Sequence, residues 1–222
     1  MQMNSKPITD YKLLSKEDIH KVLAKYKGDN HKPVSDYIDN ISQKIMAHGN
    51  KRLIIDCFCG VGESTYKLSE KYPDFLIIGF DKSLKRLQRQ NSFKKQNPKN
   101  LLLFQADIFD FYLMLSDLVK DYDFKIEKQY ILYPNPWPKK KNAKKRVYLN
   151  NVIPYLFALK STIEVRSNWG RFLIEFSYSA EYFKYNHEFY QLRPKIPMTP
   201  FEKKYFLSGQ SLNKLLLKPL KL

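Results

Sequence analysis

The stretch LIIDCFCGVGEST (residues 53–65) joins a short apolar run to a glycine turn and a polar segment. The run LIID has the length and composition of a buried strand. The G-x-G turn leads into a predicted helix that ends before Pro73. A strand, a glycine turn and a helix in this order are typical of the first unit of a parallel α/β sheet.

The same alternation continues along the chain. Further strands are predicted at residues 75–81, 101–107, 130–134, 162–167 and 212–217, and further helices at 83–96, 108–120, 146–160 and 168–178. Because the strands are nearly continuous apolar runs between helices, we expect a parallel sheet covered by helices on both faces. No repeat or low-complexity linker interrupts this pattern, so residues 51–222 are predicted to form one globular unit.

Residues 1–50 are predicted to form a helical N-terminal extension. Ser15 and Asp18 resemble a capping box ahead of an apolar segment, and a second helix is expected from near Pro33 to before Gly49. The first residues lack the apolar region of a signal peptide, and no apolar run approaches the ~20 residues that span a bilayer. We therefore expect a cytoplasmic protein without a membrane partner.

The composition gives a formal net charge of +17. Such a surplus indicates a polyanionic partner such as nucleic acid or an anionic membrane surface. Lysine is abundant throughout the chain, so the local clustering of cations is more informative than their total. Cys57 and Cys59 are interpreted as small buried residues beside the glycine turn. Neither the cysteines nor the scattered histidines form a metal-binding pattern, and we expect no metal.

Three acidic residues end three successive predicted strands: Asp56, Asp81 and Asp107. The carboxyl ends of the strands form the ligand-binding edge of such a sheet. Any one of these residues could serve only as a helix cap or turn former. Three in succession behind a loop that contains Gly60 and Gly62 indicate a cofactor with a nucleoside part.

S-adenosylmethionine fits these residues better than NAD does. A carboxylate at the glycine loop, Asp56, suits a positively charged sulfonium and would repel a pyrophosphate. Asp81 is placed to accept hydrogen bonds from both ribose hydroxyls, and Asp107 from an adenine amino group. The lysine of a phosphate-binding loop is also missing. We therefore predict S-adenosylmethionine as the cofactor.

The fourth predicted strand leads into the segment YPNPWPKKKNAKKR (residues 133–146). Prolines on both sides of Asn135 fix its backbone, and its amide can donate to and accept from the edge of a base. Trp137 either stacks on a ligand or packs against the protein. The cations that follow are predicted to contact RNA phosphates or to form a solvated loop. The predicted phosphate contacts are Lys140, Lys141, Lys144, Lys145 and Arg146.

This segment resembles the Pro-Asp-Pro-Trp motif and basic stretch of the tRNA (guanine-N7)-methyltransferases. VRSNWGRFLIEF (residues 165–176) is similar to the part of that family that carries a Thr-Asp pair. TPFEKKYFLSGQSL (residues 199–212) is similar to the family's Thr-x-Phe-Glu segment. The three resemblances occur in the family's order and together cover roughly residues 50–217.

The resemblance implies a Rossmann-like, seven-stranded class I methyltransferase sheet. It also implies an enzyme that transfers a methyl group from S-adenosylmethionine to N7 of a guanine in the variable loop of tRNA, by in-line displacement, with Asn135 as the catalytic residue. The positions that it implies for cofactor contact are Asp56, Asp81, Asp107 and Asn135. The positions that it implies for substrate contact are Lys139, Asn168, Thr199 and Glu202.

Two positions depart from the family pattern, because its aspartates in Pro-Asp-Pro-Trp and Thr-Asp are Asn135 and Asn168 here. Both changes remove a negative charge from the predicted pocket and weaken hydrogen bonds to guanine. Two alternatives therefore stay open. One is a non-catalytic RNA-binding protein on a methyltransferase scaffold, and the other is a methyltransferase that acts on another RNA base or an amine. The expected partner is tRNA or another structured RNA.

Overall fold

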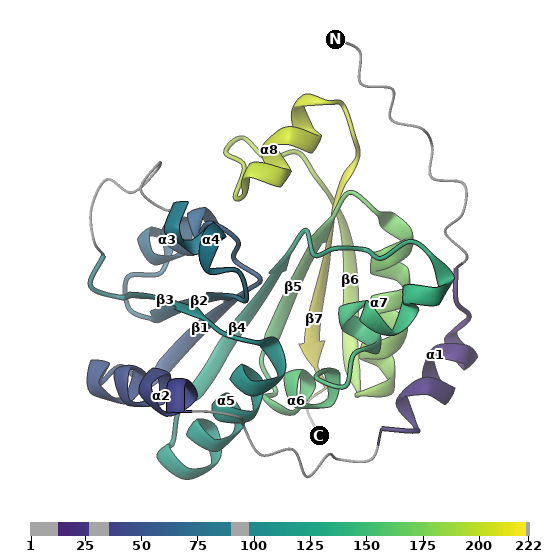
Figure 1. Cartoon of the computed structure of the whole chain (residues 1–222). Coiled ribbons are helices and arrows are strands. Elements are labelled where there is room, and N and C mark those ends of the chain that lie inside the picture. The colour runs from purple at the N-terminus through teal and green to yellow at the C-terminus, as the bar shows by residue number, and fades with distance from the viewer. Residues whose placement is uncertain (1–12, 27–35, 90–97, 221–222) are drawn as a thin grey trace.

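The structure is a computed structural model that describes residues 13–26, 36–89 and 98–220. Its centre is a seven-stranded sheet of order β3-β2-β1-β4-β5-β7-β6 (Figure 1). The strands are β1 (Arg52–Cys57), β2 (Leu76–Asp81), β3 (Leu101–Gln105), β4 (Lys125–Leu132), β5 (Thr162–Ser167), β6 (Tyr185–Leu192) and β7 (Leu212–Pro219). The strands β1 to β5 pair in parallel, and β7 runs antiparallel to both β5 and β6. The predicted Rossmann-like, seven-stranded sheet is confirmed.

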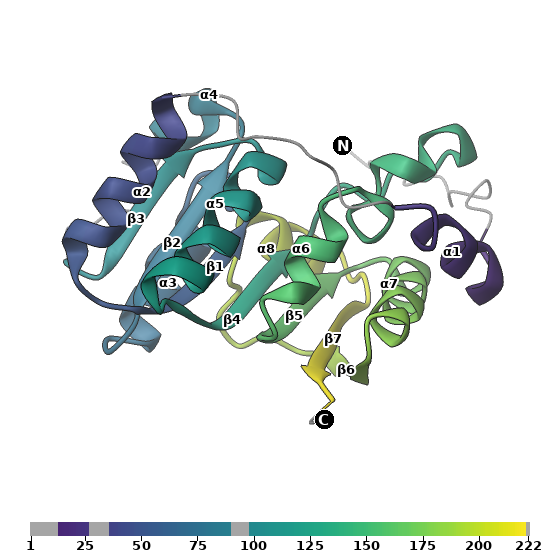
Figure 2. The same ribbon diagram turned by 90° about the horizontal axis from the view of Figure 1, so that it is seen from below.

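Helices cover both faces of this sheet. They are α1 (Lys16–Leu23), α2 (Asp36–His48), α3 (Glu63–Lys71), α4 (Leu84–Leu87), α5 (Ile108–Tyr122), α6 (Ile153–Ala158), α7 (Gly170–Tyr182) and α8 (Pro200–Leu207), with 3-10 helices η2 (Lys140–Lys145) and η3 (Val147–Leu149). The helices α1, α2, α5, α6 and α7 share one hydrophobic cluster, whereas α3 packs on the other face. Figure 2 shows α1 beside α7 and α2 beside α5.

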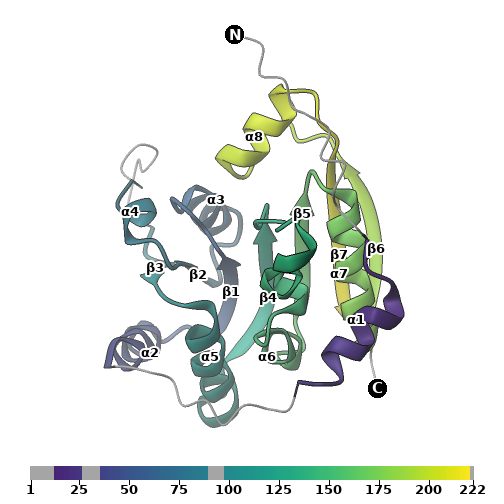
Figure 3. The same cartoon turned by 45° about the vertical axis from the view of Figure 1, so that its right-hand side comes forward.

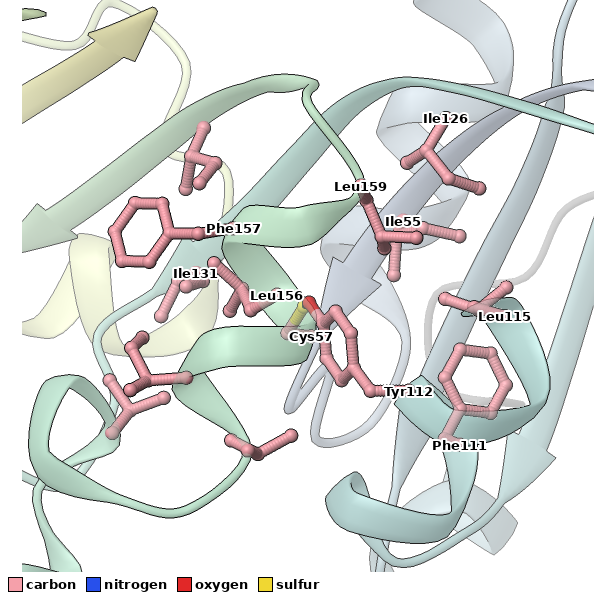
Figure 4. Close-up of a cluster of buried hydrophobic side chains, with 14 of the residues drawn as sticks. Ile55, Cys57, Phe111, Tyr112, Leu115, Ile126, Ile131, Leu156, Phe157 and Leu159 are labelled. Carbon is pink, nitrogen blue, oxygen red and sulfur yellow. The ribbon is translucent and has the colours of Figure 1, made fainter. Parts of the chain in front are cut away.

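The alternation of side chains in β1 builds these two layers. Ile55 and Cys57 belong to the larger cluster, and Figure 4 shows them among side chains of α5 and α6. Ile54, which precedes Ile55, faces the opposite layer and packs in one cluster with Leu68 of α3. Cys57 and Cys59 are both buried free thiols, as the sequence predicts. A strand that is apolar on both faces is therefore held from both sides.

The N-terminal helices belong to the same hydrophobic core. Ser15 caps α1 by accepting a hydrogen bond from Asp18 N–H at 3.1 Å, which confirms the predicted capping interaction. Ile19 and Leu23 of α1 and Ile45 of α2 are buried in the cluster that contains α7 and α5. None of the helices in the described part of the chain combines the length and apolarity that a membrane span requires.

The predicted helix over residues 146–160 is wrong in its first part. The chain there forms η3 and a turn, and α6 begins only at Ile153. Asn150 interrupts the helix because its side-chain oxygen accepts a hydrogen bond from Val152 N–H, as in an Asx turn. Pro154 then lies in the first turn of α6, where its missing N–H has no cost.

Several other boundaries differ from the prediction. β4 begins at Lys125, before the predicted start, because its first residues pair with β1. β3 ends at Gln105, so Asp107 follows it as a helix cap. The predicted helix over residues 83–96 is seen as α4, and residues 90–97 lie outside the described part of the chain, as does Pro33.

The sequence pattern did not reveal β6 and α8. β6 is an edge strand with mostly exposed, polar side chains, so it lacks a strong alternation of apolar residues. α8 has Glu202 as its single buried side chain, so it lacks a buried apolar face. Pattern reading depends on apolar burial, and neither element supplies it.

We expect Gly79→Ala to lower the free energy of unfolding by about 1–3 kcal/mol, because the added methyl overpacks the contact between β2 and α3. A Cβ atom at Gly79 would lie 2.3 Å from Thr65 Oγ1 and 2.7 Å from Leu103 Cδ2. Urea unfolding measures the change. Gly170→Ala is the control, since no atom lies within 4 Å of its added Cβ. Equal stability of the two variants would contradict the close packing described here.

Candidate functional site

A cavity of about 1960 Å³ opens at the carboxyl ends of the parallel strands. Figure 3 shows α8 above these strand ends, across from α3 and α4. The lining comes from the glycine loop after β1, the ends of β2 and β4, the start of α5, the region before α7, and α8. A pocket for one small ligand usually measures about 300–1000 Å³. The cavity is therefore large enough for a cofactor and a second group beside it.

The glycine loop forms the first wall. Gly60 and Gly62 have φ angles of +62° and +83°, which favour glycine. A Cβ at Gly60 would meet no atom within 4 Å, so its backbone is open to close approach by a ligand. A Cβ at Gly62 would lie 2.9 Å from Leu103 Cδ1. Gly60 thus leaves room for a ligand, and Gly62 leaves room for β3.

Asp56 lies buried beneath this loop and does not line the cavity. Its Oδ2 accepts hydrogen bonds from Ser64 Oγ at 2.6 Å and Thr65 Oγ1 at 2.7 Å, which anchors the start of α3. Its Oδ1 is buried and has no partner among the described residues. Burial raises the pKa of Asp56 to about 6. The carboxylate therefore supports the loop and keeps one unsatisfied acceptor.

Asp81 is buried at the end of β2 and lines the cavity. It accepts hydrogen bonds from Gly60 N–H at 3.1 Å, from Ser83 N–H at 2.8 Å and from Arg86 Nη1 at 2.9 Å. The sequence analysis did not identify Arg86, although it follows Asp81 closely, in α4. A ligand that uses this carboxylate must share it with the guanidinium or displace it.

Asp107 lines the cavity and is exposed, but it is also the N-cap of α5. Its Oδ1 accepts a hydrogen bond from Phe109 N–H at 2.8 Å. The three predicted acids therefore reach the same edge of the sheet in different states. Asp81 and Asp107 line the cavity, whereas Asp56 lies behind it.

The loop after β4 forms the opposite wall with Asn135 and Trp137. Asn135 Oδ1 accepts a hydrogen bond from Trp137 N–H at 3.1 Å, and the Asn135 side chain is exposed to the cavity. Tyr133 and Trp137 have φ angles of +52° and +44°, which side-chain-bearing residues rarely adopt. Such backbone strain is typical of functional sites.

Arg146 contradicts its predicted role as a phosphate contact. Its side chain is completely buried and pairs with Glu175 Oε2 at 2.8 Å. Its Nε donates to Trp137 O at 3.2 Å, and its Nη2 donates to Pro138 O at 3.3 Å. The prediction was wrong because the guanidinium points inward and cannot reach an RNA backbone.

The lysines of the basic segment differ from Arg146 in exposure. The exposed ones are Lys139, Lys141, Lys144 and Lys145. Lys144 and Lys145 line the cavity, and the Lys145 ammonium lies 4.9 Å from the centre of the Trp137 ring. Lys139 does not line the cavity, and the side chain of Lys140 lies outside the described part of the structure.

Of the other predicted substrate contacts, two line the cavity and one is buried away from it. Asn168 lines the cavity, and its Nδ2 donates to Gln210 Oε1 at 2.7 Å. Thr199 also lines the cavity, but its hydroxyl caps α8 by accepting from Glu202 N–H. Glu202 contradicts the prediction that it contacts substrate. It is fully buried, and both its oxygens accept from Arg166 Nη1 at 3.0 and 3.2 Å.

An aromatic wall of the cavity was missed by the sequence analysis. The rings of Tyr133 and Tyr205 lie 5.9 Å apart, and those of Phe201 and Tyr205 lie 6.3 Å apart. All three residues line the cavity, and Phe201 is 55% exposed. The spacing of Phe201 and Tyr205, which places them on one face of α8, was the available signal.

Charges around the cavity favour an anionic ligand at its rim. Its lining contains six cationic residues and three acidic ones. These are Lys82, Arg86, Arg89, Lys144, Lys145 and Arg171, with Glu63, Asp81 and Asp107. The described residues contain no group of His, Cys, Asp and Glu that could hold a metal ion. The cavity thus combines acids at the sheet edge with an excess of cations around them.

Residues 50–215 match the family model described as "Putative methyltransferase". A tRNA (guanine-N(7)-)-methyltransferase of Wolbachia pipientis wMel is 30% identical over 164 residues, which are 72% of this chain and 67% of the relative. The chain belongs to the tRNA (guanine-N7)-methyltransferase family.

Relatives with the same description occur in two further bacteria. The one from Thermotoga maritima is 28% identical over 60% of this chain and 43% of its own length. The one from Aquifex aeolicus is 29% identical over 73% of this chain and 54% of its own length. The matched segments thus span 43% to 67% of the length of these three curated relatives.

Solved structures confirm the fold. An antibiotic-related methyltransferase superposes with a TM-score of 0.54 at 15% identity, over 85% of this chain and 97% of that one. The 16S rRNA methyltransferase KamB superposes with a TM-score of 0.51 at 12% identity, over 87% of this chain and 98% of that one. At such low identity these likenesses establish the class I methyltransferase architecture alone.

Membership in this family makes S-adenosylmethionine the methyl donor. The residues at the sheet edge fit this cofactor. Gly60 leaves open space for close approach, and Asp81 presents a carboxylate to the cavity at the end of the second strand. The unsatisfied Oδ1 of Asp56 is a further acceptor beneath the loop. These features agree with the cofactor predicted from the sequence.

The raised pKa of Asp56, about 6 against an ordinary 3.8, predicts a pH dependence of stability. Between these values the folded state binds more protons than the unfolded state, so stability falls as pH rises from about 4 to about 6. One pKa unit corresponds to about 1.36 kcal/mol. The free energy of unfolding of the wild type is therefore expected to fall by about 3 kcal/mol relative to that of Asp56→Asn. Urea unfolding of both cofactor-free proteins, from about pH 3.5 to about pH 7.5, measures this difference. A difference that does not change with pH would contradict the burial of an ionisable carboxyl.

Proposed function

We propose that the protein transfers the methyl group of S-adenosylmethionine to N7 of a guanine in tRNA. The observation that carries this proposal is a single cavity with two chemically different ends. One end has the glycine loop and the acids Asp81 and Asp107, and the other has Asn135, Asn168 and the aromatic wall. The curated relatives are tRNA (guanine-N(7)-)-methyltransferases, which supports the same substrate and atom.

At the cofactor end, the chain's groups bind and orient. Asp81 accepts hydrogen bonds from the ribose hydroxyls, with Arg86 moving aside or sharing the carboxylate. Asp107 keeps one carboxylate oxygen beyond its capping bond, which suits an adenine amino group. Asp56 acts from behind the glycine loop, because its hydrogen bonds from Ser64 and Thr65 hold the start of α3 in place. S-adenosylmethionine supplies an electrophilic methyl group on a sulfonium.

At the base end, the side-chain amides of Asn135 and Asn168 each use one polar atom in a hydrogen bond within the protein. The other polar atom of each amide is left to bind a base. Asn135 Oδ1 is held by Trp137 N–H, so Asn135 offers its NH₂ donor to the cavity. This donor suits guanine O6, an acceptor next to N7. Asn168 Nδ2 is held by Gln210, so Asn168 offers its carbonyl oxygen. This acceptor suits the N–H groups on the opposite edge of guanine.

The reaction requires positioning more than proton transfer. Guanine N7 carries a lone pair and no proton, so no general base is needed. The chain's contribution is to hold the base in line with the sulfonium methyl and to exclude water. The prolines beside Asn135 and the rings of Tyr133, Tyr205 and Phe201 provide a rigid, apolar surface for this purpose.

The exposed lysines position the RNA without reading its sequence. Lys144 and Lys145 lie on the cavity, with Lys139 and Lys141 exposed in the same segment. A phosphate backbone that follows these lysines passes beside Asn135, where the base must enter.

The direct test incubates the protein with radiolabelled S-adenosylmethionine and unmodified tRNA transcripts, followed by digestion and nucleoside identification. Labelled 7-methylguanosine is the expected product. Another labelled nucleoside would favour the alternative in which the two asparagines change the base or atom. Absence of label together with absence of cofactor binding would favour a non-catalytic RNA-binding protein.

We expect Asp81→Ala to weaken binding of S-adenosylmethionine by about 1–3 kcal/mol, because the ribose hydroxyls lose their acceptor. Isothermal titration calorimetry measures this change. Asp74→Ala is the matched control, since Asp74 is exposed and lies outside the cavity lining. If Asp81→Ala binds S-adenosylmethionine with wild-type affinity, Asp81 does not bind the ribose.

Charge reversal at two cavity lysines, Lys144→Glu with Lys145→Glu, is expected to weaken tRNA binding and to reduce its salt dependence. Removal of one lysine–phosphate interaction lowers the slope of log K against log salt by about 0.7–0.9. Filter binding at several salt concentrations gives the slope. The control is Lys120→Glu with Lys160→Glu. It reverses two exposed charges near the amino ends of β4 and β5, opposite the cavity. Equal slopes for both double variants would show that this segment does not contact phosphate.

A further inference from the structure

A buried ion pair lies directly behind the loop that presents Asn135. Arg146 and Glu175 are both fully buried, and Arg146 Nη1 lies 2.8 Å from Glu175 Oε2. The guanidinium also donates to the backbone carbonyls of Trp137 and Pro138. The pair thus connects α7 with the loop after β4.

The composition of the loop explains why it needs donors from elsewhere. Pro134, Pro136 and Pro138 have no N–H, so the loop can supply few donors of its own. The N–H of Trp137 is already used by Asn135 Oδ1. The carbonyls that remain must be satisfied from outside, and a guanidinium brings five N–H donors in a planar fork.

Glu175 makes it possible to bury this charge. One of its oxygens accepts from Arg146 and from Tyr148 Oη. The other accepts from the backbone N–H of Leu14 at 2.6 Å. Hydrogen bonds therefore run from the segment before α1, through α7, to the loop at the cavity.

Stability alone does not account for such a pair. Replacing a buried ion pair by uncharged groups is often neutral or stabilising, because both charges must lose their hydration. What the pair adds here is a fixed backbone at Trp137, whose φ of +44° is unfavourable for a residue with a side chain. The ion pair opposes relaxation of that residue, and relaxation would move Asn135.

We infer that Arg146 and Glu175 are positioning residues, which hold Asn135 and Trp137 in the geometry needed for methyl transfer. The inference rests on the proposed function. It reassigns a cation of the basic segment from RNA contact to support of the loop. The ion pair therefore controls the rate of the chemical step and leaves RNA affinity unchanged.

The test is the double variant Arg146→Met with Glu175→Gln. It leaves no unpaired charge, and the Gln oxygen can still accept from Leu14 N–H or Tyr148. The donors to Trp137 O and Pro138 O are removed. Single-turnover methyl transfer at saturating RNA is expected to slow about tenfold to hundredfold, as for a small displacement of reacting groups. The dissociation constant for tRNA is expected to stay within about twofold of wild type, and its salt slope is expected to be unchanged.

The matched control is Lys218→Met with Glu188→Gln. It makes the same chemical changes at an ion pair of 3.0 Å between β7 and β6, away from the cavity. Its rate is expected to equal that of the wild type. A double variant of Arg146 and Glu175 with a wild-type rate would overturn the inference. A reduced salt slope would also overturn it, since Arg146 would then contact phosphate.

A second measurement does not depend on activity. In a Trp169→Phe background, Trp137 is the remaining tryptophan of the chain, and acrylamide quenching reports its accessibility. Removing the pair is expected to raise the quenching constant, because the loop relaxes. If quenching rises but the wild-type protein methylates no tRNA, the proposed function fails, while the support of the loop by the ion pair stands. An unchanged quenching constant would show that the ion pair does not hold the loop.

Discussion

The site depends on the register of β1 against its two parallel neighbours. Cys57 pairs with Phe80 of β2 and with Ile131 of β4, so the three strands end at one level. The glycine loop, Asp81 and the proline-rich loop then start side by side. A one-residue slip would turn every buried side chain of β1 to the wrong layer, which makes the register costly to change. The absence of a side chain at Gly79 lets α3 pack against this central group of strands.

The sequence predicted the parts of the site that follow from the order of strands and loops. It did not predict which charged side chains are buried. Acids at strand ends and a glycine turn follow from the alternation of strands and helices. Arg146 and Lys145 are neighbours in one basic run, yet one is fully buried and the other exposed. No local pattern records this difference, because the partner of Arg146 is Glu175, on a distant helix. Glu202 was misread for the same reason, since Arg166 on β5 takes both its oxygens.

Three of the six non-glycine residues with positive φ in the described part of the chain line the cavity. Phe58, Tyr133 and Trp137 all have φ between +44° and +58°, and all three line it. For a residue with a side chain, this left-handed backbone conformation costs roughly 1–2 kcal/mol. The surrounding structure must hold them, through the packing of Phe58 against Phe80 and the hydrogen bonds to Trp137. A wall held in this way does not need to reorganise when a base enters, which suits a reaction that requires positioning and no proton transfer.

The two asparagines argue for a retained catalytic pocket once their partners are known. A backbone N–H such as that of Trp137 can only donate, so it fixes the oxygen of Asn135 and turns the amide nitrogen outward. An aspartate in the same turn would present a second carboxylate oxygen in place of this amide nitrogen. Asn168 is oriented in the opposite sense, because Gln210 Oε1 takes its NH₂ group while Gln210 Nε2 donates to Ser208. The cavity therefore offers one donor and one acceptor in fixed directions, although two negative charges are missing relative to the family pattern.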